Sequence, residues 1–243
     1  MTDSREIEKA AIIKSMDLSR TGDLFLNLAK MAFSGIPGGG AIAALLDYGL
    51  KDMKEQRLKN FVAEVIPDLR ELNVIINSDY VKTEDFAYLL EHTLRGVSQH
   101  YQKEKLDAYR ALLVNSLIRL DVESERKEYF LNILNGLTTI HIVFLRVLID
   151  PMKWASRKRI DVTQPATGNG PTALTNLRLL LPKYEETQIR SVMSDLYYDG
   201  LIKLLPSNLI DVVGPDLEPI INMLTPLGKN FLDFIMIESK AAS

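Results

Sequence analysis

The chain has 243 residues, a formal net charge of -3 and a hydrophobic fraction of 47%. This composition is ordinary for a packed globular protein, and the length allows one large domain or two small ones. The absence of cysteine excludes disulfides, thiolate catalysis and cysteine metal sites, and it fits a reducing cytoplasm. The weak negative charge argues against a surface coated with nucleic acid, although it leaves room for a local basic patch.

The N-terminal residues do not have the pattern of a secretory signal. They read MTDSREIEKAAIIKSM, in which acidic and basic residues alternate, whereas a signal needs a basic start followed by an apolar block. The most apolar stretch, 24–50, is interrupted by Lys30, by a proline-glycine corner and by Asp47. Neither half reaches the ~20 apolar residues of a transmembrane helix. We therefore expect a soluble, cytoplasmic protein.

Residues 1–150 show helical periodicity and no convincing strand. Apolar residues recur at the three-and-four spacing of an amphipathic helix. Thr83, and Thr138 or Thr139, stand where N-cap residues are expected. The predicted helices cover residues 5–16, 24–33, 41–67, 79–91, 107–120, 123–137 and 139–149. We predict that residues 1–150 form an all-helical bundle with a glycine-rich corner at 35–40.

The segment FSGIPGGGAIAALL at 33–46 has three interpretations. A phosphate-binding loop needs a strand before the glycines and usually Lys-Ser or Lys-Thr after them, whereas here a helix precedes and Ala-Ile follows. A membrane-seeking hairpin of two apolar arms is the second. We favour the third, a corner between two helices, in which Pro37 ends one helix and the alanines let the next approach a neighbour. The glycines of this corner are Gly38, Gly39 and Gly40.

The character of the sequence changes at 151–171, which we predict to be a basic linker. The stretch KWASRKRIDVTQPATGNGPT contains prolines, glycines and a cluster of cations around a tryptophan. Such a cluster is suited to an anionic partner, either a nucleic-acid backbone or an anionic lipid surface. The alternative is a solvated linker whose tryptophan packs on the bundle. The residues concerned are Lys153, Trp154, Arg157, Lys158 and Arg159, together with Arg190 in a later helix.

Residues 172–243 are predicted to form a small domain of helices and short strands. The expected elements are helices at 172–181 and 185–199, strands at 201–205 and 220–224, and a closing helix. Thr172 is the expected N-cap of the first helix, and Gly200 closes the second in the C′ position. Thr225 caps the closing helix, with Pro226 in its first turn.

Two segments of this domain resemble winged-helix proteins. LYYDGLIKLL at 196–205 is similar to the corner that ends a recognition helix, and MLTPLGKNFLDFI at 223–235 is similar to the Leu-Thr-x-x-Gly step into a closing helix. The resemblance implies a β-wing between these two segments. The expected fold class is therefore mainly α: a helical bundle followed by a small C-terminal winged-helix domain, itself α+β.

The layout of the whole chain also resembles the abortive-infection alpha family of bacterial proteins. The similar pieces are AYRALLVNSLI at 108–118, EYFLNILNGLTTIHIVFLRVL at 128–148 and the C-terminal step just quoted. These are packing motifs, so the resemblance carries no catalytic residue over to this chain. What it implies is a role in phage defence.

The sequence offers little that is typical of an enzyme. His92, His100 and His141 are not at metal-binding spacing, and there is no HExxH motif, no GxSxG motif and no histidine with an obvious carboxylate to orient it. His141 follows a predicted helix cap, and we interpret it as a hydrogen-bonded structural residue. We predict no catalytic residue, no cofactor and no metal site.

Two functional hypotheses remain. The first is a non-enzymatic bacterial effector or interaction protein of the abortive-infection kind, which acts by self-association, partner binding or peripheral membrane contact. A protein partner or a second copy of the chain is expected. The second is a winged-helix transcription regulator whose helical domain dimerises or senses a ligand. The helix around Arg190 also carries Glu186, Asp195 and Asp199, a poor composition for a phosphate-lined groove, so we expect only weak nucleic-acid binding.

Overall fold

The computed structural model describes most of the chain after residue 82. The described residues are 57–58, 60–61, 64–65, 68–69, 80, 83–162, 171–214 and 216–237. The predicted helices at 5–16 and 24–33, the corner at Gly38–Gly40 and most of the predicted helix 41–67 lie outside them.

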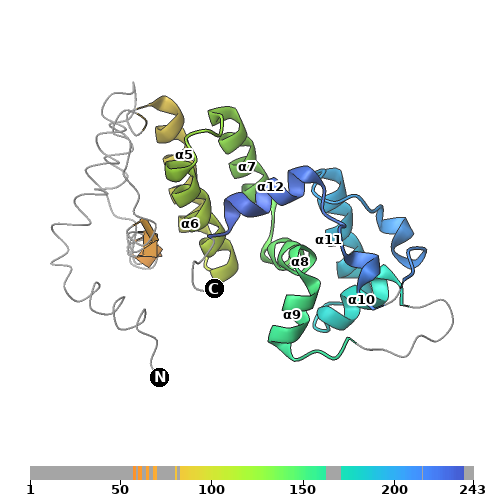
Figure 1. Cartoon of the computed structure of the whole chain (residues 1–243). Coiled ribbons are helices and arrows are strands. Elements are labelled where there is room, and N and C mark those ends of the chain that lie inside the picture. The colour runs from red at the N-terminus through yellow and green to blue at the C-terminus, as the bar shows by residue number, and fades with distance from the viewer. Residues whose placement is uncertain are drawn as a thin grey trace. The chain divides into compact units, whose positions relative to one another are not determined.

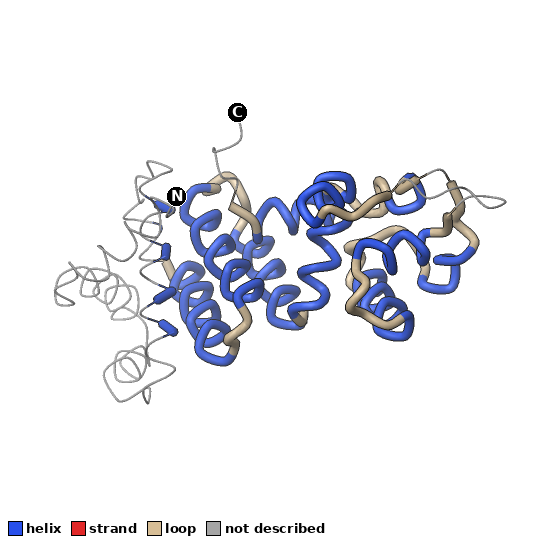
Figure 2. The backbone as a smooth tube through the Cα atoms, turned by 90° about the horizontal axis from the view of Figure 1, so that it is seen from below, coloured by secondary structure: helices blue, strands red, loops and turns tan. Residues whose placement is uncertain are grey.

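The described part of the chain is mainly α-helical, as predicted, and it contains no strand (Figure 1 and Figure 2). The α-helices are α5 (Glu84–Gln99), α6 (Lys103–Ile118), α7 (Ser124–Gly136), α8 (Thr139–Ile149), α9 (Pro151–Lys158), α10 (Ala173–Leu180), α11 (Glu186–Tyr198) and α12 (Pro226–Ile235). Two short 3-10 helices, η2 (Pro206–Ile210) and η3 (Glu218–Ile220), lie between α11 and α12. The predicted caps Thr83 and Thr172 are confirmed, because each hydroxyl accepts the backbone N–H three residues later.

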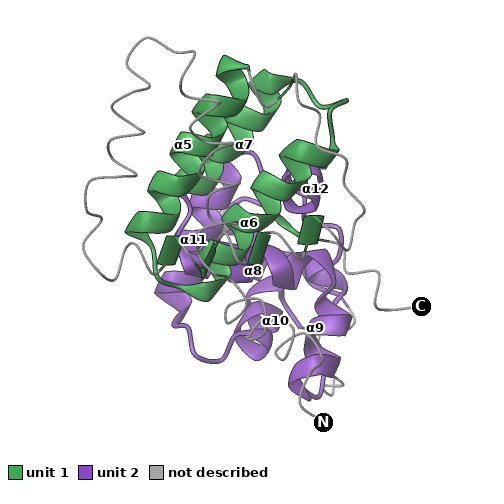
Figure 3. Ribbon diagram, turned by 90° about the vertical axis from the view of Figure 1, so that its left-hand side faces the viewer, with its two compact units in different colours: residues 1–135, 234–243 green, residues 136–233 purple. Residues whose placement is uncertain are grey.

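The chain divides into two compact units (Figure 3). Unit 1 contains residues 1–135 and 234–243, and unit 2 contains residues 136–233. This division differs from the predicted boundary at residue 150. The reason is α8, which packs against α9 and α11 of unit 2.

Two buried lysines hold the α6–α7 pair of unit 1. Lys105, in the first turn of α6, donates to the carbonyl oxygens of Leu134 and Asn135 at the end of α7. Lys127, near the start of α7, donates to the carbonyl oxygen of Ser116 near the end of α6, at 3.1 Å. The last carbonyls of a helix lack intrahelical partners and favour a nearby cation. Because each lysine reaches from the start of one helix to the end of the other, the two helices run antiparallel.

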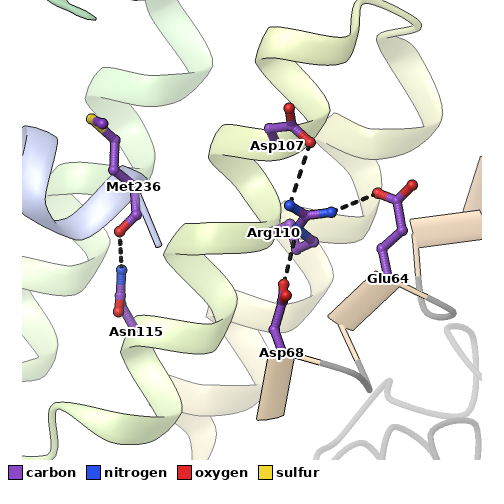
Figure 4. Close-up of polar contacts among 6 residues, drawn as sticks. All are labelled: Glu64, Asp68, Asp107, Arg110, Asn115 and Met236. Carbon is purple, nitrogen blue, oxygen red and sulfur yellow. Dashed lines mark hydrogen bonds and ion pairs between the residues drawn. The ribbon is translucent and has the colours of Figure 1, made fainter. Parts of the chain in front are cut away.

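Arg110 of α6 gathers three carboxylates in unit 1 (Figure 4). It lies 2.9 Å from Glu64, 3.0 Å from Asp68 and 3.7 Å from Asp107. Glu64 and Asp68 are helical and four residues apart, so they lie on one helix face. The guanidinium, with donors along several directions, therefore joins that face to α6.

The C-terminal end of α12 is bound by a side chain of α6. The side-chain amide of Asn115 donates to the carbonyl oxygen of Phe234 at 2.8 Å and to that of Met236 at 3.1 Å; Figure 4 draws the second of these bonds. The ring of Phe234 lies 5.4 Å from that of Phe130, measured between centroids. These contacts satisfy carbonyls that a helix end leaves without partners, and they place the residues after 233 in unit 1.

A tight corner in unit 2 gives the Leu-Thr-x-x-Gly pattern its physical basis. Gly200 has a φ of +71°, the left-handed conformation predicted for it. The hydroxyl of Thr225 donates to the Gly200 carbonyl oxygen at 2.6 Å and accepts the backbone N–H of Gly228 at 2.9 Å. A Cβ atom on Gly228 would lie 2.1 Å from the carbonyl oxygen of Leu201. Only glycine therefore lets the start of α12 approach this corner.

The two predicted strands of unit 2 are wrong. Residues 201–205 and 220–224 meet at one isolated antiparallel bridge, Ile202 with Leu224. The bridge does not extend because Ile220 belongs to η3 and Asn222 has a left-handed φ of 62°, which departs from the extended region. A second isolated bridge joins Thr172 to Val213.

The predicted linker is wrong over residues 151–158, which form α9. Pro151 occupies the first turn of α9, where its missing N–H costs no hydrogen bond. The carboxylate of Asp150 accepts the backbone N–H of Lys153 at 2.9 Å and caps the helix. Ala155 is 3% exposed and fixes the inner face of α9.

Candidate functional site

The predicted anionic-partner residues of α9 lie together on a short, well-capped helix. We call Lys153, Arg157, Lys158 and Arg159 the α9 basic cluster, and all four side chains are exposed. Within the described residues, none of the four forms an ion pair with a carboxylate. In this part of the chain the cluster therefore presents four exposed charges without a carboxylate partner.

Trp154 is the anchor of this helix and not part of its exposed face. It is half-buried, and its indole N–H donates to the carbonyl oxygen of Leu180 in α10, at 3.2 Å. The ammonium of Lys158 lies 5.5 Å from the centroid of the indole ring, within the range of a cation–π contact. This arrangement fixes the orientation of α9, because the indole can donate only one hydrogen bond.

Arg159 ends α9 in a conformation that arginine rarely adopts. Its φ is 55° and its ψ is 41°, the left-handed region in which glycine is usual at helix ends. The backbone N–H of Ile160 bonds to the carbonyl oxygen of Ala155 at 2.9 Å, which closes the helix around this residue. A left-handed conformation costs an L-residue about 1–2 kcal/mol. The arginine at this position therefore lowers the stability of the folded chain relative to glycine.

Arg190, the remaining predicted contact residue, does not join the α9 basic cluster. It belongs to α11, and its guanidinium lies 2.9 Å from the carboxylate of Glu186 one turn earlier. Glu186 also lies 3.7 Å from Arg178. The charge of Arg190 is therefore compensated by a carboxylate of its own helix, unlike the charges of the α9 basic cluster.

His141 has a carboxylate partner that the sequence did not reveal. Its Nε2 lies 3.1 Å from the carboxylate of Asp195, and its Nδ1 lies 2.7 Å from the hydroxyl of Thr138. The backbone N–H of Thr138 also donates to Nδ1, so Nε2 carries the proton that Asp195 accepts. Burial raises the pKa of Asp199, and nearby His141 opposes that rise while Asp195 adds to it.

A hydroxyl, an imidazole and a carboxylate in series have the composition of a nucleophilic site. Here the threonine and the histidine form the capping box of α8, with the hydroxyl and the imidazole each engaged by backbone N–H groups. Asp195 is on α11, so the series ties the start of α8 to that helix. Its geometry accounts for the packing of unit 2, and we assign it that role.

An acidic groove in unit 1 is a second feature that the sequence did not indicate. Its volume is about 740 Å³, and it is lined from α5 and from the residues at the start of α7. The lining residues are Tyr80, Glu84, Asp85, Tyr88, Leu89, Glu123, Ser124, Glu125, Lys127 and Glu128. Most of the carboxylates belong to the first turns of α5 and α7 or lie just before them, where the helix dipole favours acidic residues.

The remaining candidate sites either lie outside the described residues or are not found among them. The Gly38–Gly40 corner lies outside the described residues. Among the described residues, no group of three or more histidine, aspartate or glutamate side chains is placed to hold a metal ion. In the same part of the chain, no single helix has the length and apolar composition needed to cross a membrane, and only α7 and α8 taken together reach it.

Comparison with protein-family models, with curated proteins and with solved structures gives no match for this chain. Any indication of function therefore comes from the chain's own residues, above all from the α9 basic cluster.

Proposed function

We propose that this protein is a non-enzymatic interaction protein that docks on a polyanionic partner through the α9 basic cluster. The observation that carries the proposal is the set of four exposed cations on one capped helix, without carboxylate partners in the described part of the chain. Exposed like charges repel one another, and an anionic surface removes that repulsion when it binds. A surface selected only for solubility would interleave both signs.

The expected biological role is antiviral defence of the abortive-infection kind, as the sequence resemblance implies. A helical effector that docks on an anionic partner needs no catalytic group, only an available surface. Its inducible overproduction in bacteria should slow growth, and the double variant Lys153→Gln/Arg157→Gln should relieve that effect. Equal toxicity of the two chains at equal abundance would contradict a role for the cluster.

Polyanion binding itself is measured on immobilised heparin, as the salt concentration at which the full chain elutes. Lys153→Gln/Arg157→Gln should elute at lower salt, because a chain with fewer cationic contacts releases fewer counterions when it binds. The matched control is Lys203→Gln/Lys229→Gln, which removes two exposed cations of unit 2 outside α9. If both pairs lower the elution salt equally, net charge explains retention and the cluster has no special role.

A winged-helix transcription regulator is the second candidate. It is supported by the sequence resemblance and by the corner in which Thr225 and Gly228 bring the start of α12 against Gly200 and Leu201. In that reading α10, α11 and α12 form a winged-helix domain with a reduced wing. A sequence-specific duplex complex in the nanomolar range, with a steep dependence on salt, would favour the regulator over the effector.

A further inference from the structure

We infer that the polyanion bound by the α9 basic cluster is an anionic membrane surface, an assignment that rests on the proposed function. In this arrangement α9 lies on the headgroups, with Met152 directed into the acyl boundary and Lys153 and Arg157 at the phosphates. The occupant is a lipid surface rather than a nucleic acid because the exposed face of α9 is both cationic and apolar.

The outward face of α9 follows from its helical register. Pro151 and Ala155 are buried, and the exposed side of the helix carries Met152, Ser156, Lys153 and Arg157, in that order around its axis. Met152 is 51% exposed. Ile149, at the end of the preceding helix, is 42% exposed. Apolar side chains beside lysine and arginine are the composition of helices that lie in the membrane interface.

Two of the four cations, Lys153 and Arg159, are not explained by the stability of α9. Arg157 and Lys158 lie in the last turn, where the helix dipole favours cations. Lys153 lies in the first turn, where the dipole disfavours them, and it stands four residues from Arg157, at the spacing of a repelling pair. Arg159 occupies a left-handed position that glycine would fill with less strain. Both positions keep a positive charge against local preference, which is expected where a partner uses it.

A nucleic acid fits this face less well. Phosphate contacts in a duplex are polar and charged, so an exposed methionine beside the cations gains little there. At a lipid surface the same side chain leaves water, and the long stems of lysine and arginine reach the headgroups while their methylene groups stay in the interface. The distinguishing residue is therefore Met152 and not any of the four cations.

The test is sedimentation of the full chain with vesicles of phosphatidylglycerol and phosphatidylcholine, and with phosphatidylcholine alone, at about 0.1 M salt, where charges act over ~10 Å. Binding to the anionic vesicles is expected, with much less on the neutral ones. Each cation near an anionic surface changes the partition constant roughly fivefold, so Lys153→Gln/Arg157→Gln should bind roughly 25-fold more weakly. The control Lys203→Gln/Lys229→Gln should lose clearly less. Trp154 is the only tryptophan of the chain, so its emission reports the environment of α9 directly.

Two single variants extend the test: Met152→Ser separates the membrane from other polyanions, and Arg159→Gly separates a loss of binding from a loss of stability. Met152→Ser should weaken vesicle binding about fivefold, as expected for a half-exposed apolar side chain, and leave the heparin elution unchanged. Arg159→Gly should also weaken vesicle binding about fivefold while the melting temperature stays the same or rises, because glycine relieves the left-handed backbone. A loss of binding in Arg159→Gly thus cannot be attributed to unfolding.

Failure of the membrane assignment differs from failure of the proposed function. The chain could be retained on heparin or duplex DNA through Lys153 and Arg157 and yet not bind anionic vesicles. This result would overturn the membrane assignment but would still support polyanion docking. Vesicle binding that is indifferent to Met152→Ser would also overturn the inserted geometry. Absence of cluster-dependent binding to heparin, DNA and vesicles alike would overturn both.

Discussion

Lys105 is a buried cation whose replacement should change how the stability of the protein depends on pH. Its side chain is 1% exposed and donates to the carbonyl oxygens of Leu134 and Asn135 at the end of α7. Burial lowers the pKa of its ammonium to about 8. Lys105→Met keeps a long unbranched side chain at the position and removes the titrating group.

The direction of this pH dependence follows from the number of protons bound by the folded and the unfolded chain. In the unfolded chain the lysine pKa returns to about 10.4, so between pH ~8 and ~10 the unfolded state holds more protons than the folded state. The free energy of unfolding therefore rises with pH across this window. A shift from 10.5 to about 8 corresponds to about 3 kcal/mol in all, of which about 2 kcal/mol is gained between pH ~7 and ~9.5.

The upper limit of the window is set by two tyrosines. Burial raises the pKa of Tyr80 and of Tyr109 to about 12, so both side chains remove stability as the pH rises above ~10, where unfolded tyrosine ionises. Burial also lowers the pKa of Lys127, which adds a change of the same sign as Lys105. Subtracting the Lys105→Met profile from that of the unmodified chain cancels these shared contributions.

The measurement is urea unfolding followed by far-UV circular dichroism at closely spaced pH values from ~7 to ~9.5, with the free energy extrapolated to water. As the pH rises, the free energy of unfolding of the unmodified chain should increase by about 2 kcal/mol relative to that of Lys105→Met. Lys103→Met, two residues earlier on the exposed face of α6, is the matched control and should leave the profile unchanged. Parallel profiles for the unmodified chain and Lys105→Met would refute a depressed pKa at Lys105.

Three glycine-to-alanine substitutions test the packing of the two units by thermal and urea unfolding. In Gly96→Ala the new Cβ would lie 2.3 Å from the ring of Tyr109, so we expect a loss of about 1–3 kcal/mol through overpacking, and an unchanged stability would show that the ring can shift. In Gly228→Ala the Cβ would lie 2.1 Å from the backbone carbonyl oxygen of Leu201, which cannot turn aside, so the loss should reach or exceed ~3 kcal/mol. Gly136→Ala meets nothing within 4 Å and should instead raise stability by up to ~1 kcal/mol, because alanine favours the helix; destabilisation there would contradict the open surroundings of α7.

Local rules predicted much of the helical structure, since helix ends are determined by residues close in the chain. Thr172 before α10 and Thr225 before α12 were recognised by the hydroxyl that an N-cap needs, and Gly200 by the positive φ that a helix end needs. The same rules also contained the signal for α9, an aspartate followed by a proline at the first helical position. Prolines and cations nearby were given more weight, and the helix was predicted as a linker.

Contacts between distant residues could not be predicted in this way. His141 and Asp195 are separated by 54 positions, and nothing in either neighbourhood indicates the other. The predicted strands failed for a related reason: most of their apolar residues are buried, although Leu205 and Ile221 are 40% and 44% exposed, but pairing depends on the backbone of both segments. Asn222, in a left-handed conformation, limits the pairing to a single bridge. Apolar content predicted the burial of most of these residues and not their hydrogen bonding.

The placement of the cations distinguishes the α9 basic cluster, which the sequence indicated, from basic residues that serve the fold. Lys105 and Lys127 are 1% and 2% exposed, and each donates to carbonyl oxygens at a helix end, so both charges serve the fold. Lys153 and Arg157 are exposed, form no ion pair within the described residues, and repel each other across one turn. All four are basic residues near helix termini. Burial and hydrogen bonding separate them, because a cation already bound by the protein gains little from an external anion, whereas an unpaired exposed cation keeps its attraction for one.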